Sequence, residues 1–219
     1  MISVPAEALG MLDLMEDPLF PGLDPEDRVR SIRRSIDIGR ACAAQHLGCD
    51  PEADLVRAGV VIRRIEDDTV RLDHASRIQA QIFYGPDACR VELHMAELLH
   101  KQEVLTTYGL DVDLDWVARL HLAHEFYHFL EFSGGRRTGD EVGPIRVRGF
   151  LRSRPRVLRS ASEIAAHTFA ETVTGSPIHP KLTDYLVLVS DGTMTEEEFA
   201  HLAATAQARV QEGTSHEDL

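Results

Sequence analysis

Cysteine is scarce in this sequence, which has only Cys42, Cys49 and Cys89 in 219 residues and no Cys-x-x-Cys pair. An odd number of separated cysteines argues against a disulfide framework and favours reduced thiols. Long apolar runs are missing as well: nowhere do the roughly 18 consecutive apolar residues of a membrane-spanning helix occur. The first 20 residues contain neither Lys nor Arg, so they do not resemble a signal peptide. We therefore expect a soluble, cytoplasmic protein that does not enter a membrane.

Positive charge is also in short supply. Lys and Arg number 23 against 36 Asp and Glu, a net charge of −13, and such a chain repels phosphates and anionic membrane surfaces. Residues 133–160 are the exception, since they carry eight arginines against Asp140 and Glu141. We expect this arginine-rich segment to contact the acidic body of the same chain or a substrate, and we do not expect direct binding to nucleic acid.

Glycines, prolines and helix-capping residues divide the chain into helices and three short strands. Alternating apolar residues mark the strands, and the GPDA stretch at 85–88 predicts a hairpin between the second and the third. The pattern predicts an α+β fold, in which a small, mostly antiparallel sheet packs on helices and a C-terminal helical hairpin closes the chain. The expected helices span about 24–47, 50–59, 96–106, 113–134, 160–174, 180–190 and 195–211, and the expected strands 60–66, 78–84 and 89–95.

Several helix starts have candidate capping side chains, which accept hydrogen bonds from the first free N–H groups. The candidates are Asp113 or Asp115 for the helix of 113–134, Ser160 or Ser162 for that of 160–174, and a Thr195–Glu198 capping box for the last one.

The segment HLAHEFYHFLEF (121–132) places polar groups inside an apolar helix. A buried imidazole or carboxylate without a partner costs several kcal/mol, so these groups need compensation. His124 and His128 are one helical turn apart, so both can reach a single zinc ion. Glu125 projects about 100° round from His124, which suits a general base for a bound water. The HExxH pattern therefore predicts a zinc site with Glu125 as the catalytic residue.

A site with two histidines needs a third protein ligand while one position stays open. On the expected helix of 160–174, Glu163, Ala166, His167 and Ala170 share one face. The small alanines allow this helix to approach the motif helix closely, so Glu163 is the predicted third ligand. His167, one turn on, is an alternative ligand, or a group that supports a ligand or faces the substrate.

Other side chains near the motif have less defined roles. His121 and Glu131 lie on the metal side of the motif helix, either as ligands, as partners of ligands or as polar residues at a pocket rim. Tyr84, Tyr127 and His167 are candidates for a substrate-side group that stabilises negative charge in the transition state.

HEFYH at 124–128, followed by EIAAHTFA at 163–170, resembles the ImmA/IrrE-type zinc metallopeptidases of bacteria. The upstream order also fits that family, and the resemblance covers about residues 26–175. It implies that His124, His128 and Glu163 bind zinc, that Glu125 is the base, and that the protein regulates by cleaving or displacing a helix-turn-helix repressor in trans. His167 is a departure, because the family usually has Asn there.

We therefore predict a zinc-dependent metallopeptidase, a regulatory endopeptidase whose substrate is a cytoplasmic protein or peptide such as a transcriptional repressor. The alternative is an antirepressor of the same fold that retains metal but only binds its target. The expected parts are a loose leader (1–24), a metallopeptidase domain (25–175) and a C-terminal helical extension (176–219).

A di-iron site is a competing interpretation, because Glu125-x-x-His128 and Glu97-x-x-His100 are both ExxH pairs, which such sites use. Glu198-x-x-His201 is a third ExxH pair. ExxH pairs are therefore frequent in this chain and do not by themselves mark a di-iron site. The strands also interrupt the four-helix bundle that such a site needs.

Overall fold

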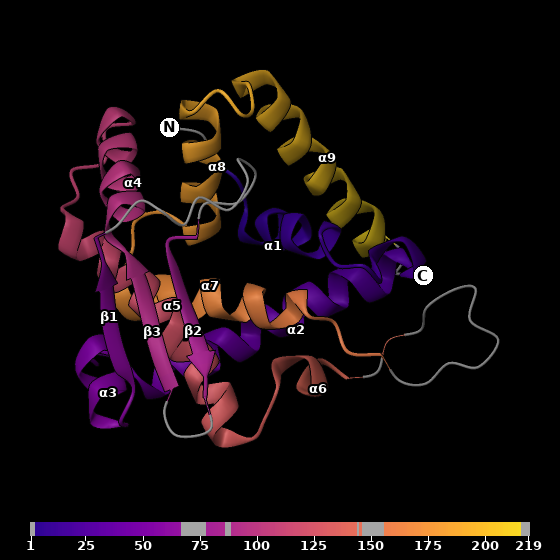
Figure 1. Cartoon of the computed structure of the whole chain (residues 1–219). Helices are drawn as coiled ribbons and strands as arrows, with labels where there is room; N and C mark the ends of the chain where they lie inside the picture. Colours follow the sequence, from indigo (N-terminus) through magenta and orange to yellow (C-terminus); the bar gives the residue numbers. More distant parts are fainter. Residues whose placement is uncertain (1–2, 67–77, 86–88, 144, 146–155, 216–219) are drawn as a thin grey trace.

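The computed structural model describes residues 3–66, 78–85, 89–143, 145 and 156–215. The chain forms an α+β fold with a three-stranded sheet, which confirms the predicted class (Figure 1). The described elements are α1 (Ala6–Met15), the 3-10 helix η1 (Phe20–Gly22), α2 (Pro25–Gln45), α3 (Pro51–Arg57), β1 (Val61–Ile65), β2 (Ala80–Tyr84), β3 (Cys89–His94), α4 (Met95–Thr107), α5 (Leu114–Gly134), α6 (Thr138–Val142), α7 (Ser160–Thr174), α8 (Pro180–Ser190) and α9 (Glu196–Ser215).

The sheet is mixed rather than mostly antiparallel. β3 lies in the middle, paired antiparallel with β2 and parallel with β1. The β2–β3 pairing confirms the expected hairpin, although residues 86–88 of its GPDA turn lie outside the described residues. Val91 and Leu93 of β3 are fully buried, in agreement with the predicted alternation. β2 is left as an edge strand, and it packs against α5.

Helix α5, which carries the histidine motif, has the predicted boundaries. Of the two candidate caps, Asp113 is the one that acts, since its carboxylate accepts a hydrogen bond from the Trp116 N–H at 2.7 Å. The helix ends where Gly135 adopts a left-handed conformation, φ +62°, which a glycine adopts without steric cost.

Helix α7 begins as predicted, but neither candidate serine caps it. Asp17, from the N-terminal segment, does so: its Oδ2 accepts hydrogen bonds from the backbone N–H groups of Arg159 (2.9 Å) and Ser160 (3.1 Å). Ser160 is itself the first helical residue. The positive end of the helix dipole also stabilises a carboxylate next to the free N–H groups. The N-terminal segment of the chain therefore sets where α7 starts.

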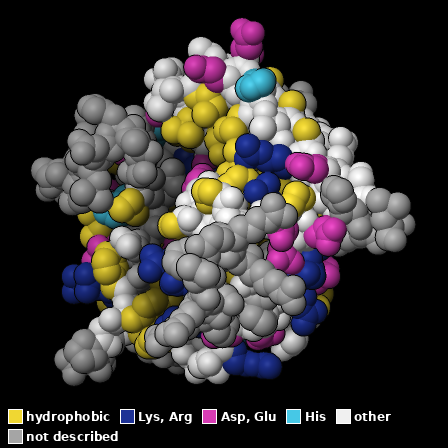
Figure 2. All heavy atoms as spheres, turned by 90° about the vertical axis from the view of Figure 1, so that its right-hand side faces the viewer, with side chains coloured by type: hydrophobic (Ala, Val, Ile, Leu, Met, Phe, Trp, Pro, Cys, Tyr) yellow, Lys and Arg dark blue, Asp and Glu magenta, His cyan; other side chains and the backbone are white. Residues whose placement is uncertain are grey.

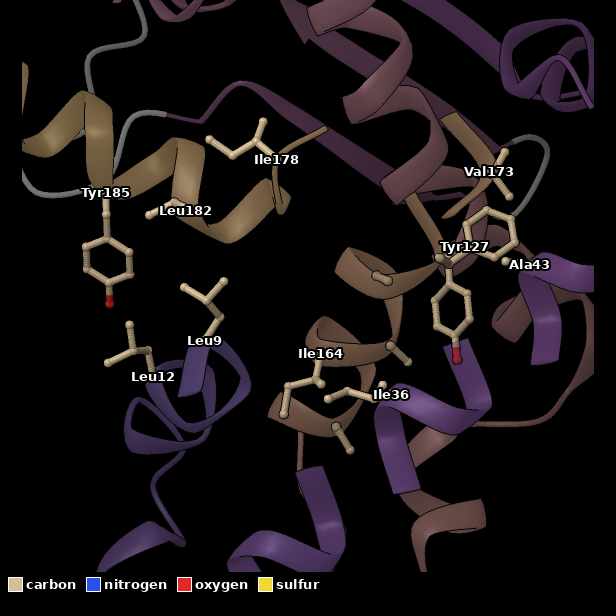
Figure 3. Packing of buried hydrophobic residues seen from close by; sticks show 14 of the residues in the cluster. Leu9, Leu12, Ile36, Ala43, Tyr127, Ile164, Val173, Ile178, Leu182 and Tyr185 are labelled. Carbon is tan, nitrogen blue, oxygen red and sulfur yellow. The ribbon is translucent and has the colours of Figure 1, made fainter. Parts of the chain in front are cut away.

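The prediction of a loose leader over 1–24 is wrong. Residues 6–15 form α1, and Leu9, Met11, Leu12 and Leu14 are almost completely buried. Figure 3 shows Leu9 and Leu12 in the same apolar cluster as Tyr185 of α8. The proline, the acids and the methionines of this segment suggested a loop, but its apolar side chains bury more surface as a helix inside the core.

Helix α8 has the predicted boundaries, whereas α9 ends at Ser215, four residues beyond the predicted end at 211. Thr195 and Glu198 form the expected reciprocal capping box, with the Glu198 N–H donating to Thr195 Oγ1 and the Thr195 N–H donating to the Glu198 carboxylate. The hairpin is open, however. α9 leaves α8 and packs mainly on α1 and α2, on the side of the molecule away from the sheet (Figure 1). The expected extension is therefore packed on the N-terminal helices.

Three helices at the centre hold the candidate site together, since α7 packs against both α2 and α5. No described helix has the length and apolarity needed to cross a bilayer. On the face drawn in Figure 2, Lys and Arg side chains lie among Asp and Glu side chains as far as the described residues extend. Most of the arginine-rich segment, residues 144 and 146–155, lies outside them.

Candidate metal centre

The predicted ligands come together in the structure. His124 and His128 lie one turn apart on α5, and Glu163 reaches them from the first turn of α7. The Nε2 atoms of the two histidines are 3.1 Å apart. Glu163 Oε2 is 3.3 Å from His124 Nε2, and Glu163 Oε1 is 3.5 Å from His128 Nε2. Among the described residues, this is the cluster of His, Cys, Asp and Glu that could hold a metal ion.

These separations suit a tetrahedral zinc ion. Zinc–ligand bonds of about 2.0–2.1 Å place two ligand atoms roughly 3.3–3.4 Å apart along a tetrahedron edge. The three distances lie close to that value, with each histidine contacting a different oxygen of Glu163. Two neutral imidazoles and a carboxylate also form a donor set that zinc accepts. The residues present therefore fit the metal that the motif predicts.

The charges at the triad favour an ionised Glu163. Partial burial would raise the pKa of Glu163, whose side chain is 50% exposed, but hydrogen bonds and charges from His124 and His128 hold that pKa well below its usual range. Burial lowers the pKa of His128, yet its contacts with Glu131 and Glu163 outweigh that effect and raise it to about 10. The Glu163 carboxylate is therefore charged and ready to neutralise a cation.

Glu125 is buried, 6% exposed, beside the edge strand. Its Oε2 accepts a hydrogen bond from the backbone N–H of Ile82 on β2 at 2.9 Å. Its carboxylate lines the same hollow as His124, His128 and Glu163. The edge strand thus fixes the orientation of the predicted base next to the predicted ligands.

Glu131 is a partner of a ligand, one of the roles left open for it. Its Oε2 lies 3.3 Å from His128 Nδ1 and accepts a hydrogen bond from the Ser162 hydroxyl. Its Oε1 accepts from the Thr138 N–H at 2.7 Å. A carboxylate on the far ring nitrogen fixes the tautomer and the orientation of a ligating histidine. Glu131 therefore orients Nε2 of His128 toward His124 and Glu163, the other predicted ligands.

His167 is buried next to the triad rather than within it. Its ring centroid is 4.8 Å from that of His124, and its Nδ1 is 3.2 Å from Oδ2 of Asp13 on α1. Lys181 holds the other oxygen of Asp13 at 2.7 Å. Burial alone would lower the pKa of His167, but the charge of Asp13 outweighs it and raises that pKa. His167 lines a hollow together with Glu125 and Glu163, which is compatible with the predicted substrate-facing role.

Of the three remaining candidates, His121 and Tyr84 lie in the hollows next to the triad and Tyr127 does not. His121 lies within 3.1 Å of the Lys101 ammonium and lines the hollow that His167 lines, so it supports the pocket without joining the triad. Tyr84 lines the hollow around the metal ligands. Tyr127 does not: its hydroxyl is buried 2.6 Å from Thr138 Oγ1, between α5 and α6, which removes it from the substrate side.

The geometry gives no support to a di-iron centre. His100 pairs with Asp191 at 2.7 Å, far along the chain from the motif helix. His201 is exposed on α9. The described part of the chain therefore brings neither of these ExxH pairs to the histidine motif.

Sequence reasoning missed the polar residues that other segments bring to the site. They are Asp13, Ser162, Lys181 and Asp184. Asp13 could have been found from the sequence, since it is a carboxylate inside the apolar run ALGMLDLM, the same anomaly that drew attention to the motif helix.

Comparison of the chain with models of protein families, with curated proteins and with solved structures gives no match.

Proposed function

We propose that this protein is a zinc-dependent metallopeptidase. The observation that carries the proposal is the convergence of His124, His128 and Glu163, whose ligand atoms lie within 4.8 Å of one another, with Glu125 buried beside them. The resemblance of the two motifs to ImmA/IrrE-type metallopeptidases supports the same function. It also supports a regulatory endopeptidase that acts on a protein substrate such as a helix-turn-helix repressor.

In the proposed mechanism, a bound zinc ion supplies Lewis-acid chemistry, which polarises a carbonyl and acidifies a water. Glu125 takes a proton from the attacking water and delivers it to the leaving amine. The Ile82 N–H occupies only Oε2 of Glu125, so Oε1 serves as the base. Asp13 holds Nδ1 of His167, and His167 lines a hollow with Glu125 and Glu163, so its remaining ring nitrogen would stabilise charge that develops on the carbonyl oxygen.

A second candidate function is a protein that binds its target without cleaving it. It would keep the same three ligands, and displacement of a repressor would need only the surface around them. The position of Glu125 in the same hollow as His124, His128 and Glu163 favours the peptidase, because binding without cleavage needs no general base there.

Metal analysis of purified variants tests the site first. The wild-type protein should hold about one zinc ion per chain, and His124→Ala or His128→Ala should lose it, because two remaining ligands bind zinc weakly. Glu163→Ala should weaken zinc binding far more than His167→Ala. His201→Ala, at an exposed histidine of α9, is the matched control. Full zinc occupancy in a His124→Ala/His128→Ala double variant would overturn the metal site.

Activity of Glu125→Gln tests the chemistry separately. This variant should retain zinc and lose cleavage of a proteome-derived peptide mixture by about 10²–10⁴-fold, because only the base is removed. Mass spectrometry of the mixture measures the loss. A Glu125→Gln protein that still displaces a repressor from its operator, and a wild-type protein that cleaves nothing, would favour the binding function instead.

A further inference from the structure

Three hollows adjoin along the candidate metal centre and form one groove. The first, about 310 Å³, and the second, about 430 Å³, share His124, Glu125 and Glu163 in their walls. The second and the third, about 690 Å³, share Tyr84 and His128. The groove therefore passes from the buried Asp13–His167 pair, across the ligands, to the far side of His128.

The far end of the groove is apolar and exposed. Tyr84 of β2, Phe132 at the end of α5 and Val157 before α7 all line the third hollow, and they are 42%, 55% and 44% exposed. The rings of Tyr84 and Phe132 stack with centroids 4.1 Å apart. Three large apolar side chains from separate elements that face one hollow mark a binding site more strongly than scattered ones do.

The rim of this apolar hollow carries positive charge. Arg137 and Arg159 line it, and neither guanidinium forms an ion pair with another described residue. The acids are Asp140 and Glu131, and Glu131 is paired with His128 at 3.3 Å. Two arginines therefore stand against Asp140 alone, and this balance favours an acidic group next to an apolar one.

The edge strand sets how an occupant lies in the groove. The Ile82 N–H points away from β3, toward Glu125, so the backbone groups of Ala80 and Tyr84 also face the groove because strand residues alternate. No described strand pairs with this side of β2, so an extended peptide can pair with the backbone groups of Ala80 and Tyr84 while one of its side chains enters the hollow.

We propose that the Tyr84–Phe132–Val157 hollow selects substrates: it binds a bulky apolar side chain of an extended peptide, with an acidic residue beside it at Arg137 and Arg159. This inference rests on the proposed peptidase function and names its substrate class. Because an apolar hollow binds a larger apolar side chain more tightly, discrimination against Ala at that peptide position is about 10–100-fold in kcat/KM.

Quenched-fluorescent peptides that differ at one position, as Phe, Leu, Ala or Lys, test the proposal on the zinc-loaded protein. The wild type should prefer Phe and Leu over Ala by at least about tenfold. Phe132→Ser and Val157→Asp should each remove most of that preference while zinc content stays unchanged. Leu47→Ser, at a 66% exposed leucine that lines none of the three hollows, is the matched control.

A second pair of peptides, with Glu or Gln next to the Phe, tests the charged rim. Arg137→Gln should abolish the preference for Glu, and added salt should weaken that preference in the wild type. Equal cleavage of all peptides by the wild type, or an unchanged preference in both Phe132→Ser and Val157→Asp, would overturn the proposal while the peptidase function stands.

Binding of the same peptides, labelled with fluorescein, to zinc-loaded Glu125→Gln separates the two proposals. If the wild type cleaves no peptide, the peptidase proposal fails. The binding measurement then tests by itself whether the hollow selects an apolar side chain. Tighter binding of the Phe peptide that is lost on adding Phe132→Ser supports it, whereas equal binding of the Phe and Ala peptides overturns it.

Discussion

The surroundings of His179 and His167 shift the pKa values of the two histidines in opposite directions. Their rings lie 5.8 Å apart, near the N-terminus of α8. Burial lowers the pKa of His179 to about 3, and the nearby His167 adds to that effect. His179 therefore stays neutral in the folded protein, and its Nδ1 accepts a hydrogen bond from the Lys181 N–H at 3.2 Å, as an N-cap does.

This depressed pKa predicts a loss of stability in acid. The unfolded chain binds a proton at His179 below about pH 6.5 while the folded chain does not, so the free energy of unfolding falls by up to about 1.4 kcal/mol per pH unit from there towards pH 3. His179→Asn keeps a cap and does not titrate, so it should lose less stability. Urea unfolding of EDTA-treated protein from pH 7 to about pH 4 measures the difference, with His201→Asn as control. Parallel curves for wild type and His179→Asn would contradict the prediction.

At the scale of whole elements, the crossing of α2 and α7 decides where Glu163 lies. Gly39 of α2 faces the backbone of Ala165 on α7, so closely that a Cβ there would overlap the Ala165 carbonyl oxygen and lie 3.1 Å from its carbonyl carbon. Ala161, Ala165 and Ala166 are fully buried on α7. The small side chains let α7 lie against α2 and α5 together, and this holds the first turn of α7 at the motif helix.

Gly39→Ala should therefore destabilise the protein although alanine is the better helix former. Overpacking against backbone atoms costs roughly 1–3 kcal/mol, more than the gain of up to about 1 kcal/mol in helix propensity. Gly134→Ala, at a position with no atom near the added Cβ, is the matched control and should be neutral or stabilising. Chemical denaturation of both variants measures the effect, and a Gly39→Ala protein as stable as Gly134→Ala would show that the crossing can relax.

On the scale of the whole molecule, the first and last helices belong to one core. α9 packs on α1 and α2, and α1 also contacts α7. Through α1, Asp13 reaches His167 and Asp17 reaches the start of α7. The candidate site therefore depends on segments at both ends of the chain.

Leu12→Ala tests that dependence. The side chain is 2% exposed, so its truncation should lower the free energy of unfolding by about 2–5 kcal/mol. The effect should appear across a single transition seen by both circular dichroism and tryptophan fluorescence. Leu47→Ala, at a 66% exposed leucine, should change stability by less than about 0.5 kcal/mol. An unchanged midpoint for Leu12→Ala would mean that α1 is dispensable.

The sequence by itself determined the features that depend on near neighbours. His124, Glu125 and His128 lie within little more than one helical turn, so their relative positions follow once α5 forms. The Asp113 cap and the Thr195–Glu198 capping box act over three residues. Strand alternation likewise predicted the burial of β3. Even Glu163 could be selected from the small residues on its own helix face.

The tertiary structure alone decided the contacts between distant segments. Asp17 replaces the predicted serine caps of α7, Asp13 supports His167, and the Ile82 N–H holds Glu125. The parallel pairing of β1 with β3 and the burial of α1 belong to the same group. Each joins residues whose separation along the chain carries no period or motif, because such contacts arise only when packing of the whole core brings the two segments together.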